Sequence, residues 1–124
     1  MTYTIAFVGN PNVGKSAWIN ALAKADFKVG NWAGVTVEKK EAHVVWGNET
    51  YHLIDLPGTH SLEEGVNEEG ITGSYLRQNK VDLLVNVLDA TNLAANLYLT
   101  LCLRELQIPM LVLFSFIDEV ENMN

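Results

Sequence analysis

The feature that most constrains this chain is an eight-residue motif with a glycine at its start and another near its end. The motif runs Gly9-Asn10-Pro11-Asn12-Val13-Gly14-Lys15-Ser16, after a strand predicted over Thr2 to Val8 and at the start of a helix predicted over Lys15 to Ala25. A strand, a glycine-containing turn and a helix in this order favour a phosphate-binding loop, because inward N–H groups and a helix N-terminus attract anions. We expect Lys15 to reach phosphate oxygens and Ser16 to ligate Mg²⁺.

Strand-like and helix-like segments alternate along the rest of the chain. This alternation predicts an α/β domain with a mainly parallel sheet and helices on both faces. Two longer segments, 26–38 and 56–67, have no clear period and are candidate functional loops. Strands are also predicted over 42–46 and 50–54, which Gly47-Asn48-Glu49 joins as an antiparallel hairpin. Two further strands, 83–88 and 110–114, are continuous apolar runs and are predicted to be covered on both faces. The other predicted helices are 68–80 and 92–106. The apolar face of the last helix is predicted from three leucines, Leu93, Leu97 and Leu101.

Composition narrows the possible partners. The 124 residues suit one domain, and 8 basic against 15 acidic residues give a net charge of −7. This charge argues against a nucleic-acid partner, because binding a phosphate backbone needs clustered Lys and Arg. Cys102 is the only cysteine, so we expect a small apolar side chain rather than a disulfide or a multi-cysteine zinc site.

A second motif follows the strand predicted over 50–54. It runs Asp55-Leu56-Pro57-Gly58. In isolation such a sequence is also an ordinary turn. Beside a phosphate-binding loop, it predicts that Asp55 holds Mg²⁺, through water, and that the Gly58 N–H meets the γ-phosphate of a nucleotide.

Thr36 lies in one of the two segments without a clear period. A lone threonine in a loop is commonly a turn or capping residue. Between the phosphate-binding helix and Asp55, its hydroxyl could complete the coordination of Mg²⁺ while its N–H bonds the γ-phosphate. Loss of that phosphate would then release the loop.

Four segments carry a resemblance to a known family. They are Gly-Asn-Pro-Asn-Val-Gly-Lys-Ser (9–16), Asn-Trp-Ala-Gly-Val-Thr-Val-Glu (31–38), Asp-Leu-Pro-Gly-Thr-His-Ser-Leu (55–62) and Asn-Val-Leu-Asp-Ala-Thr-Asn-Leu (86–93). In this order they resemble the cytosolic G domain of the bacterial ferrous-iron transporter FeoB. The resemblance covers nearly the whole chain. It implies one G domain over residues 1–124 with a Ras-like P-loop NTPase fold that lacks the final helix-strand-helix.

The resemblance also implies an activity. It implies a GTPase that hydrolyses GTP slowly to GDP and phosphate, depends on Mg²⁺ and regulates ferrous-iron uptake. It further implies activation by K⁺, with an Asn12 side-chain oxygen and backbone carbonyls around Gly30, Asn31 and Trp32 as ligands; an alternative for Asn12 is a residue chosen for turn geometry. In the family, the G domain is cytoplasmic and belongs to a protein of the inner membrane with a polytopic transport domain. The residues that carry catalysis on this reading are Asn12, Lys15, Thr36 and Gly58.

Two positions depart from what Ras-like enzymes carry. Thr59 stands where those enzymes have a water-orienting Gln, so transition-state stabilisation must come from elsewhere, for example from a cation. His60 is a candidate for positioning the water. A separate pair, His43 and His52, could face each other on the predicted hairpin, although two histidines without a third ligand more often form a plain surface pair.

The base-recognition motif is altered. The family has Asn-x-x-Asp, whereas this chain has Ser115-Phe116-Ile117-Asp118 and ends at Asn124, before the loop that would cap guanine. Asp118 could still accept hydrogen bonds from the base. We expect Ser115 to be too short to tie the base loop to the phosphate loop, which would weaken binding and selectivity. The full set of candidate nucleotide contacts is Gly9, Asn10, Pro11, Asn12, Val13, Gly14, Lys15, Ser16, Ala17, Thr36, Asp55, Gly58 and Asp118.

Two alternative functions remain open, beside a separate expectation about self-association. A non-catalytic, nucleotide-dependent interaction module would use the same loops without efficient turnover. An adenine-nucleotide kinase is disfavoured by Asp118 and by the lack of an evident lid for a second substrate. The strand predicted over 110–114 would lie at an open sheet edge, which favours self-association or segment exchange.

Overall fold

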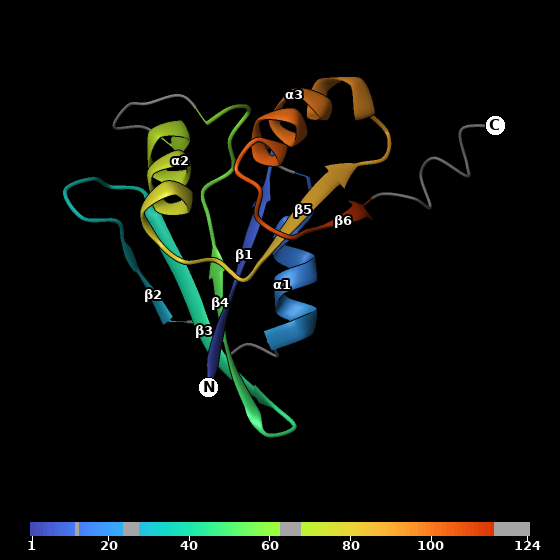
Figure 1. Cartoon of the computed structure of the whole chain (residues 1–124). Helices are drawn as coiled ribbons and strands as arrows, with labels where there is room; N and C mark the ends of the chain where they lie inside the picture. Colours follow the sequence, from blue (N-terminus) through green and yellow to red (C-terminus); the bar gives the residue numbers. More distant parts are fainter. Residues whose placement is uncertain (12, 24–27, 63–67, 116–124) are drawn as a thin grey trace.

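A computed structural model of the chain describes residues 1–11, 13–23, 28–62 and 68–115. Its strands are β1 (Thr2–Gly9), β2 (Lys28–Asn31), β3 (Glu38–Trp46), β4 (Glu49–Asp55), β5 (Leu83–Asp89) and β6 (Met110–Ser115), and its helices are α1 (Lys15–Ala23), α2 (Glu68–Gln78) and α3 (Leu93–Arg104). The strands form one sheet in the order β2-β3-β4-β1-β5-β6, with β1 inside it (Figure 1). β1 runs parallel to β4 and β5, and β5 runs parallel to β6. β3 runs antiparallel to both of its neighbours, β2 and β4. The sheet is therefore mainly parallel around β1, as the sequence predicts.

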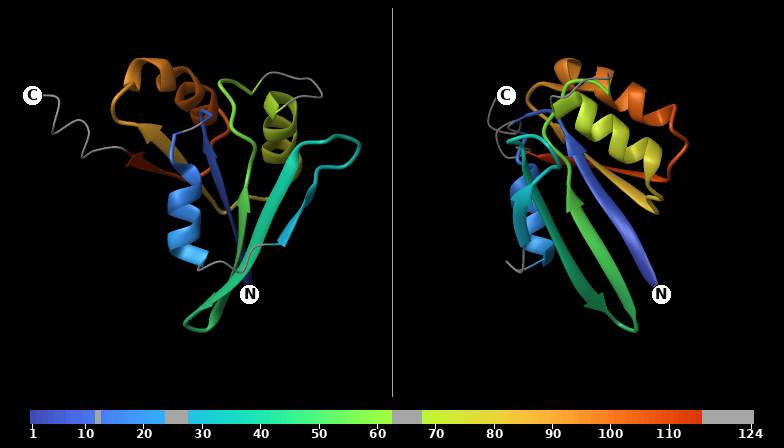
Figure 2. Two further views of the ribbon diagram at one scale, coloured as in Figure 1. Left: turned by 180° about the vertical axis from the view of Figure 1, so that it is seen from behind. Right: turned by 90° about the vertical axis from the view of Figure 1, so that its left-hand side faces the viewer.

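Helices cover both faces of the sheet, and β1 shows why. Successive side chains of a strand point to opposite faces. Ala6 and Val8 belong to a buried cluster with residues of α2 and α3, whereas Phe7 belongs to a second cluster with Val13 and Ile19 on the α1 side. Figure 2 shows α1 on one face of the sheet and α2 and α3 on the other. This arrangement confirms the predicted helix-covered α/β fold.

The first segment without a clear period contains secondary structure that the sequence analysis missed. β2 pairs antiparallel with β3, from Lys28 opposite Glu41 to Asn31 opposite Glu38. All four β2 residues are exposed, so they show no hydrophobic period from which a strand could be predicted. The hairpin prediction was nearly right, but Glu49 already belongs to β4, which leaves a turn of Gly47 and Asn48 with Gly47 at a positive φ of 64°.

The predicted apolar face of α3 was wrong. Leu93, Leu97 and Leu101 are 42%, 48% and 55% exposed. The helix turns Asn96, Leu99 and Leu103 toward the sheet instead. Because α3 is apolar nearly all round, its period does not select one face.

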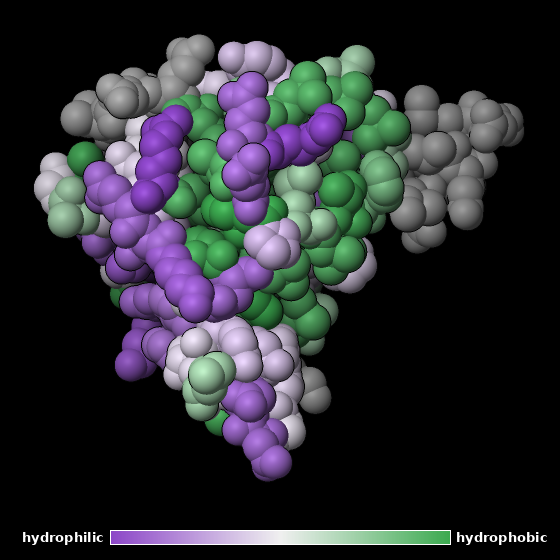
Figure 3. All heavy atoms as spheres, in the orientation of Figure 1, coloured by the Kyte–Doolittle hydropathy of each residue, from purple (hydrophilic) through white to green (hydrophobic). Residues whose placement is uncertain are grey.

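Polar partners mark the inner face of α3. The buried Asn86 of β5 donates from its side chain to the Thr100 hydroxyl at 2.7 Å. Asn96 donates from its amide to the Asn92 carbonyl at 2.7 Å. In Figure 3 the upper right of the molecule, where α3 lies, has many green side chains beside a few purple ones, which agrees with leucines on the outer side of the helix.

β6 also differs from the prediction of a strand covered on both faces. It pairs with β5 alone among the described strands and lies at the edge of the sheet. Leu111 and Phe114 are 48% and 42% exposed. The edge position itself agrees with the sequence-based expectation.

Candidate functional site

The phosphate loop lies between β1 and α1 and is held by the core. Val13 is 3% exposed and packs in the cluster under α1. A Cβ atom added to Gly9 would lie 2.8 Å from both Val13 Cγ2 and the Val87 carbonyl oxygen, so only glycine fits there. Gly14 has a φ of 82°, in the left-handed region that favours glycine. Asn12 lies outside the described residues.

The second motif packs directly against this loop. The Leu56 N–H donates to the Phe7 carbonyl at 3.1 Å, and the Thr59 N–H donates to the Gly9 carbonyl at 3.0 Å. A Cβ atom added to Gly58 would lie 2.9 Å from Pro11 Cα. The two predicted phosphate-contacting segments, far apart in the sequence, are therefore neighbours in the fold.

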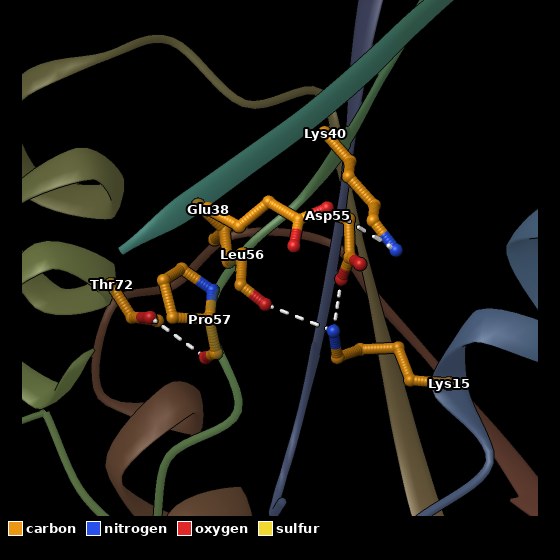
Figure 4. Close-up of polar contacts among 7 residues, drawn as sticks. All are labelled: Lys15, Glu38, Lys40, Asp55, Leu56, Pro57 and Thr72. Atoms are coloured by element: carbon orange, nitrogen blue, oxygen red, sulfur yellow. Dashed lines mark hydrogen bonds and ion pairs between the residues drawn. The ribbon is translucent and has the colours of Figure 1, made fainter. Parts of the chain in front are cut away.

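Lys15 and Asp55 meet at the centre of the site. The ammonium of Lys15, at the start of α1, forms an ion pair with the Asp55 carboxylate at the end of β4 and donates to the Leu56 carbonyl at 2.9 Å (Figure 4). Their side chains are only 11% and 12% exposed. Nearby on β3, Glu38 and Lys40 form a more exposed ion pair at 3.7 Å. The fold therefore brings together the two residues for which the sequence predicts contacts to phosphate and to Mg²⁺.

The oxygen groups near Lys15 suit Mg²⁺. Asp55 provides a carboxylate, and the hydroxyl of Ser16 lies on the exposed first turn of α1. Mg²⁺ prefers oxygen ligands and usually keeps several waters. Asp55 and Ser16 would hold the ion; Ala17, also exposed, follows on the same turn.

Thr36 is not part of this cluster. It is exposed, and among the described residues it makes no hydrogen bond to Lys15, Ser16 or Asp55. Its loop is closed by a hydrogen bond from the Trp32 N–H to the Val37 carbonyl at 2.9 Å. In Figure 1 this loop, between β2 and β3, lies beside α2.

An aromatic contact holds that loop on α2. The Trp32 ring packs edge-to-face on Tyr75, with ring centroids 5.7 Å apart, and the Lys39 ammonium lies 4.9 Å from the Trp32 ring centroid. Burial raises the pKa of the Tyr75 phenol above its ordinary value, and the charge of Glu41 adds to this shift. A cavity of about 380 Å³ lies between this loop and α2, lined by residues that include Ala33, Val35 and Ile71.

Ser115 corrects one expectation. Its hydroxyl lies within hydrogen-bonding distance of the Val13 carbonyl in the phosphate loop and, at 3.2 Å, of the Leu88 carbonyl. The residue is buried, and its own carbonyl accepts from the Ala90 N–H at 3.0 Å. Ser115 is therefore long enough to tie the end of β6 to the phosphate loop, because the two backbones approach closely here. Asp118 lies outside the described residues.

Two residues near the loop have structural partners that the sequence analysis did not foresee. Asn10 is 5% exposed and donates from its side chain to the Ala95 carbonyl at 3.1 Å, so it ties the loop to α3. Thr72 of α2 donates to the Pro57 carbonyl at 3.1 Å. Asparagine in a turn and threonine in a helix are too common to signal these long-range contacts.

Thr59 and His60 have different surroundings. Thr59 is buried, and its hydroxyl donates to the Ser61 carbonyl at 2.7 Å. His60 is exposed.

The histidine pair forms as predicted. His43 is opposite His52 in the β3–β4 register, and their rings stack with centroids 4.6 Å apart. His52 Nε2 lies 2.7 Å from Glu41 Oε2, and this hydrogen bond lowers the pKa of the Glu41 carboxyl. Within the described residues, no group of three or more Asp, Glu, His and Cys side chains is arranged to hold a metal ion.

Comparison with known proteins decides the family. The model of the family described as ferrous iron transport protein B matches residues 3–124. The chain belongs to this family. The Fe(2+) transporter FeoB of Campylobacter jejuni is 52% identical over 117 residues, which cover 94% of this chain and 19% of that relative.

Solved structures of the family give the fold. The G domain of the T. maritima FeoB iron transporter is 39% identical, has a TM-score of 0.91 and is covered to 78% by the whole of this chain. The T. maritima FeoB cytosolic domain in a GDP form has a TM-score of 0.89 at 39% identity and is covered to 49%, again by the whole of this chain. The fold is that of the FeoB G domain, a Ras-like P-loop NTPase fold.

The family resemblance extends over only part of the longer FeoB relatives. The chain spans less than a fifth of the length of the Campylobacter jejuni transporter. None of the helices that the structure describes has the length and apolar character needed to cross a membrane.

Proposed function

We propose that this chain binds a guanine nucleotide with Mg²⁺ and hydrolyses GTP slowly to GDP and phosphate. The observation that carries the proposal is the meeting of Lys15 and Asp55 beside a loop that only glycines can form at Gly9 and Gly14. The GDP form of the T. maritima FeoB cytosolic domain, which has the same fold, supports a guanine nucleotide.

Each proposed site residue has a role that follows from its chemistry. Lys15 and the loop N–H groups bind the phosphates, and Gly58 approaches the γ-phosphate. Bound Mg²⁺ supplies positive charge to the phosphates. Asp55, Ser16 and, after the loop has moved, Thr36 would hold the ion; Asp118 would read the base.

K⁺ is proposed as a second cofactor. No Gln follows Gly58, and the described geometry engages Thr59 elsewhere, so the charge that develops between the phosphates needs another source of stabilisation. Asn12 and the backbone around Gly30 and Trp32 are the proposed ligands.

Phosphate release from GTP tests this proposal. With Mg²⁺ present, the rate in K⁺ should exceed the rate in Na⁺ of equal ionic strength by about tenfold, which corresponds to about 1.4 kcal/mol in the barrier. An Asn12→Ala variant should lose most of this difference. Equal rates in the two salts, with clear hydrolysis in each, would remove K⁺ from the mechanism but leave the GTPase.

A second candidate function is a nucleotide-dependent interaction module without efficient turnover. The packing of the Thr36 loop on α2 favours it, because this loop would present a different surface when it closes on a nucleotide. GDP binding without any release of phosphate from GTP would select this alternative. Competition of ATP against GTP would test an adenine-nucleotide enzyme.

The cellular setting follows from the longer relatives. We propose that the chain acts as the cytoplasmic G domain of an inner-membrane ferrous-iron transporter and regulates its transport domain. The identity to the Campylobacter jejuni Fe(2+) transporter supports this role. We also retain the proposal that the exposed edge strand β6 allows self-association or segment exchange, which light scattering of the purified chain would test.

A further inference from the structure

We propose that Lys15 and Asp55 hold each other until both ligands arrive, so that phosphate and Mg²⁺ each raise the affinity for the other. This inference rests on the proposed nucleotide site. It concerns how contacts to phosphate and to Mg²⁺ replace the ion pair between Lys15 and Asp55.

The contacts of Lys15 are those that a phosphate must replace. A lysine ammonium has three donors. Two of them are engaged, one by the Asp55 carboxylate and one by the Leu56 carbonyl at 2.9 Å. Figure 4 shows both contacts at the Lys15 ammonium. A phosphate that arrives alone would therefore meet an ammonium with one remaining donor and a carboxylate beside it.

The surroundings make this exchange unfavourable for either ligand alone. Both side chains are close to nine-tenths buried, so neither charge is compensated well by water after it loses its partner. Phosphate alone would take Lys15 and leave Asp55 unpaired next to an anion. Mg²⁺ alone would take Asp55 and leave Lys15 unpaired next to a cation.

Together the two ligands exchange partners without leaving a charge unpaired. Lys15 passes from carboxylate to phosphate, and Asp55 passes from ammonium to Mg²⁺ and its waters. Coupling of two ligands is reciprocal, so each must raise the affinity for the other by the same factor. The ion pair thus provides a built-in source of the coupling.

Two variants separate this mechanism from simple loss of a ligand group. Asp55→Asn removes the competitor for Lys15, so GDP in EDTA should bind about tenfold or more tightly than to the wild type. Lys15→Gln removes the competitor for Asp55, so Mn²⁺ without nucleotide should bind about tenfold or more tightly. A residue that only ligates the metal, or only binds phosphate, would give neither gain.

The neighbouring pair on β3 supplies matched controls. Glu38→Gln and Lys40→Gln make the same charge changes close to the site, but these side chains are 56% and 40% exposed and pair with each other. Calorimetric titration of GDP in EDTA, and of Mn²⁺ without nucleotide, should show less than about a twofold change in these controls.

The outcomes are distinct. Gains in Asp55→Asn and Lys15→Gln that exceed their controls support the proposal, and if one variant does not fold, the other decides it. Gains no larger than in the controls, or no gains, overturn it, whereas GDP binding by the wild type in Mg²⁺ still supports the nucleotide site. Failure of the wild type to bind GDP in Mg²⁺ overturns both.

Discussion

The phosphate loop and the loop around Thr36 are expected to serve the same ligand, yet the fold holds them in different ways. The phosphate loop is fixed by buried Val13, by the close approach of Gly9 to β5 and by hydrogen bonds from Thr59 and Ser115. The Thr36 loop is only partly buried and rests on α2 through the edge-to-face contact of Trp32, whose ring also packs against the buried cluster on that side of the sheet.

These contacts indicate which part of the site is already formed before a ligand binds. Contacts that fix the phosphate loop belong to the core, so they are made whether or not a nucleotide is present. The edge-to-face contact of Trp32 with Tyr75 contributes only about 0.5–1.5 kcal/mol beyond the area it buries. Fewer buried contacts hold the Thr36 loop than hold the phosphate loop, so we expect the Thr36 loop to be the part that moves.

The largest expected effect is on stability, and it distinguishes alanine substitutions at two glycines. Gly9→Ala should lower the free energy of unfolding by about 1–3 kcal/mol, because the new Cβ would lie 2.8 Å from Val13 and Val87 atoms. Gly30→Ala should have little effect, since an added Cβ there meets nothing within 4 Å. Urea unfolding measures both. Equal effects would mean that the phosphate loop is no more tightly packed than β2.

The next effect tests the tie from β6. Ser115→Ala leaves the Val13 carbonyl without its hydroxyl donor, so GDP and ADP should each bind about 5- to 30-fold more weakly, by the same factor. Ser74→Ala, on the exposed side of α2, is the control. Calorimetric titration gives the affinities. Weakening of GDP alone would assign Ser115 to base recognition instead.

A smaller effect tests the contact that holds the Thr36 loop. Tyr75→Leu keeps an apolar side chain but loses the edge-to-face contact, so a non-hydrolysable GTP analogue should gain about 2- to 10-fold in affinity relative to GDP. Tyr98→Leu, on α3, is the matched control. An unchanged ratio for Tyr75→Leu would show that this contact does not restrain the loop.

The smallest effect concerns acid stability near this loop. The hydrogen bond with His52 lowers the pKa of Glu41 in the folded chain, so its contribution to stability is present above the ordinary glutamate value of 4.5 and is lost as pH falls through the lower folded value. Thermal unfolding should show that Glu41→Gln removes this acid-dependent loss, which is about 1 kcal/mol or less for a partly exposed pair. Glu38→Gln on the same strand controls for charge. An identical pH profile for wild type and Glu41→Gln would exclude the contribution.

The sequence predicts the site best where a backbone conformation or a close approach requires one residue type. Gly9, Gly14 and Lys15 identify the phosphate loop, and Asp55 lies beside it because β1 and β4 are neighbouring parallel strands that end at the same edge of the sheet. The buried face of α3 was predicted wrongly. The partners that select this face, such as Asn86, come from another element of the fold. The tie from Ser115 was also missed, since its reach depends on a backbone approach that no local pattern records.

Hydrogen–deuterium exchange tests most directly the claim that the phosphate side is preformed and the Thr36 loop is not. Peptides that contain Leu56 and Thr59, whose amides already donate to β1 carbonyls, should be protected with or without a GTP analogue, Mg²⁺ and K⁺. Peptides over 32–37 should change their exchange strongly when these ligands are added. If the ligands bind and the 32–37 peptides do not change, while the 56–59 peptides gain most of the protection, then the phosphate side is not preformed and the Thr36 loop is not the moving part.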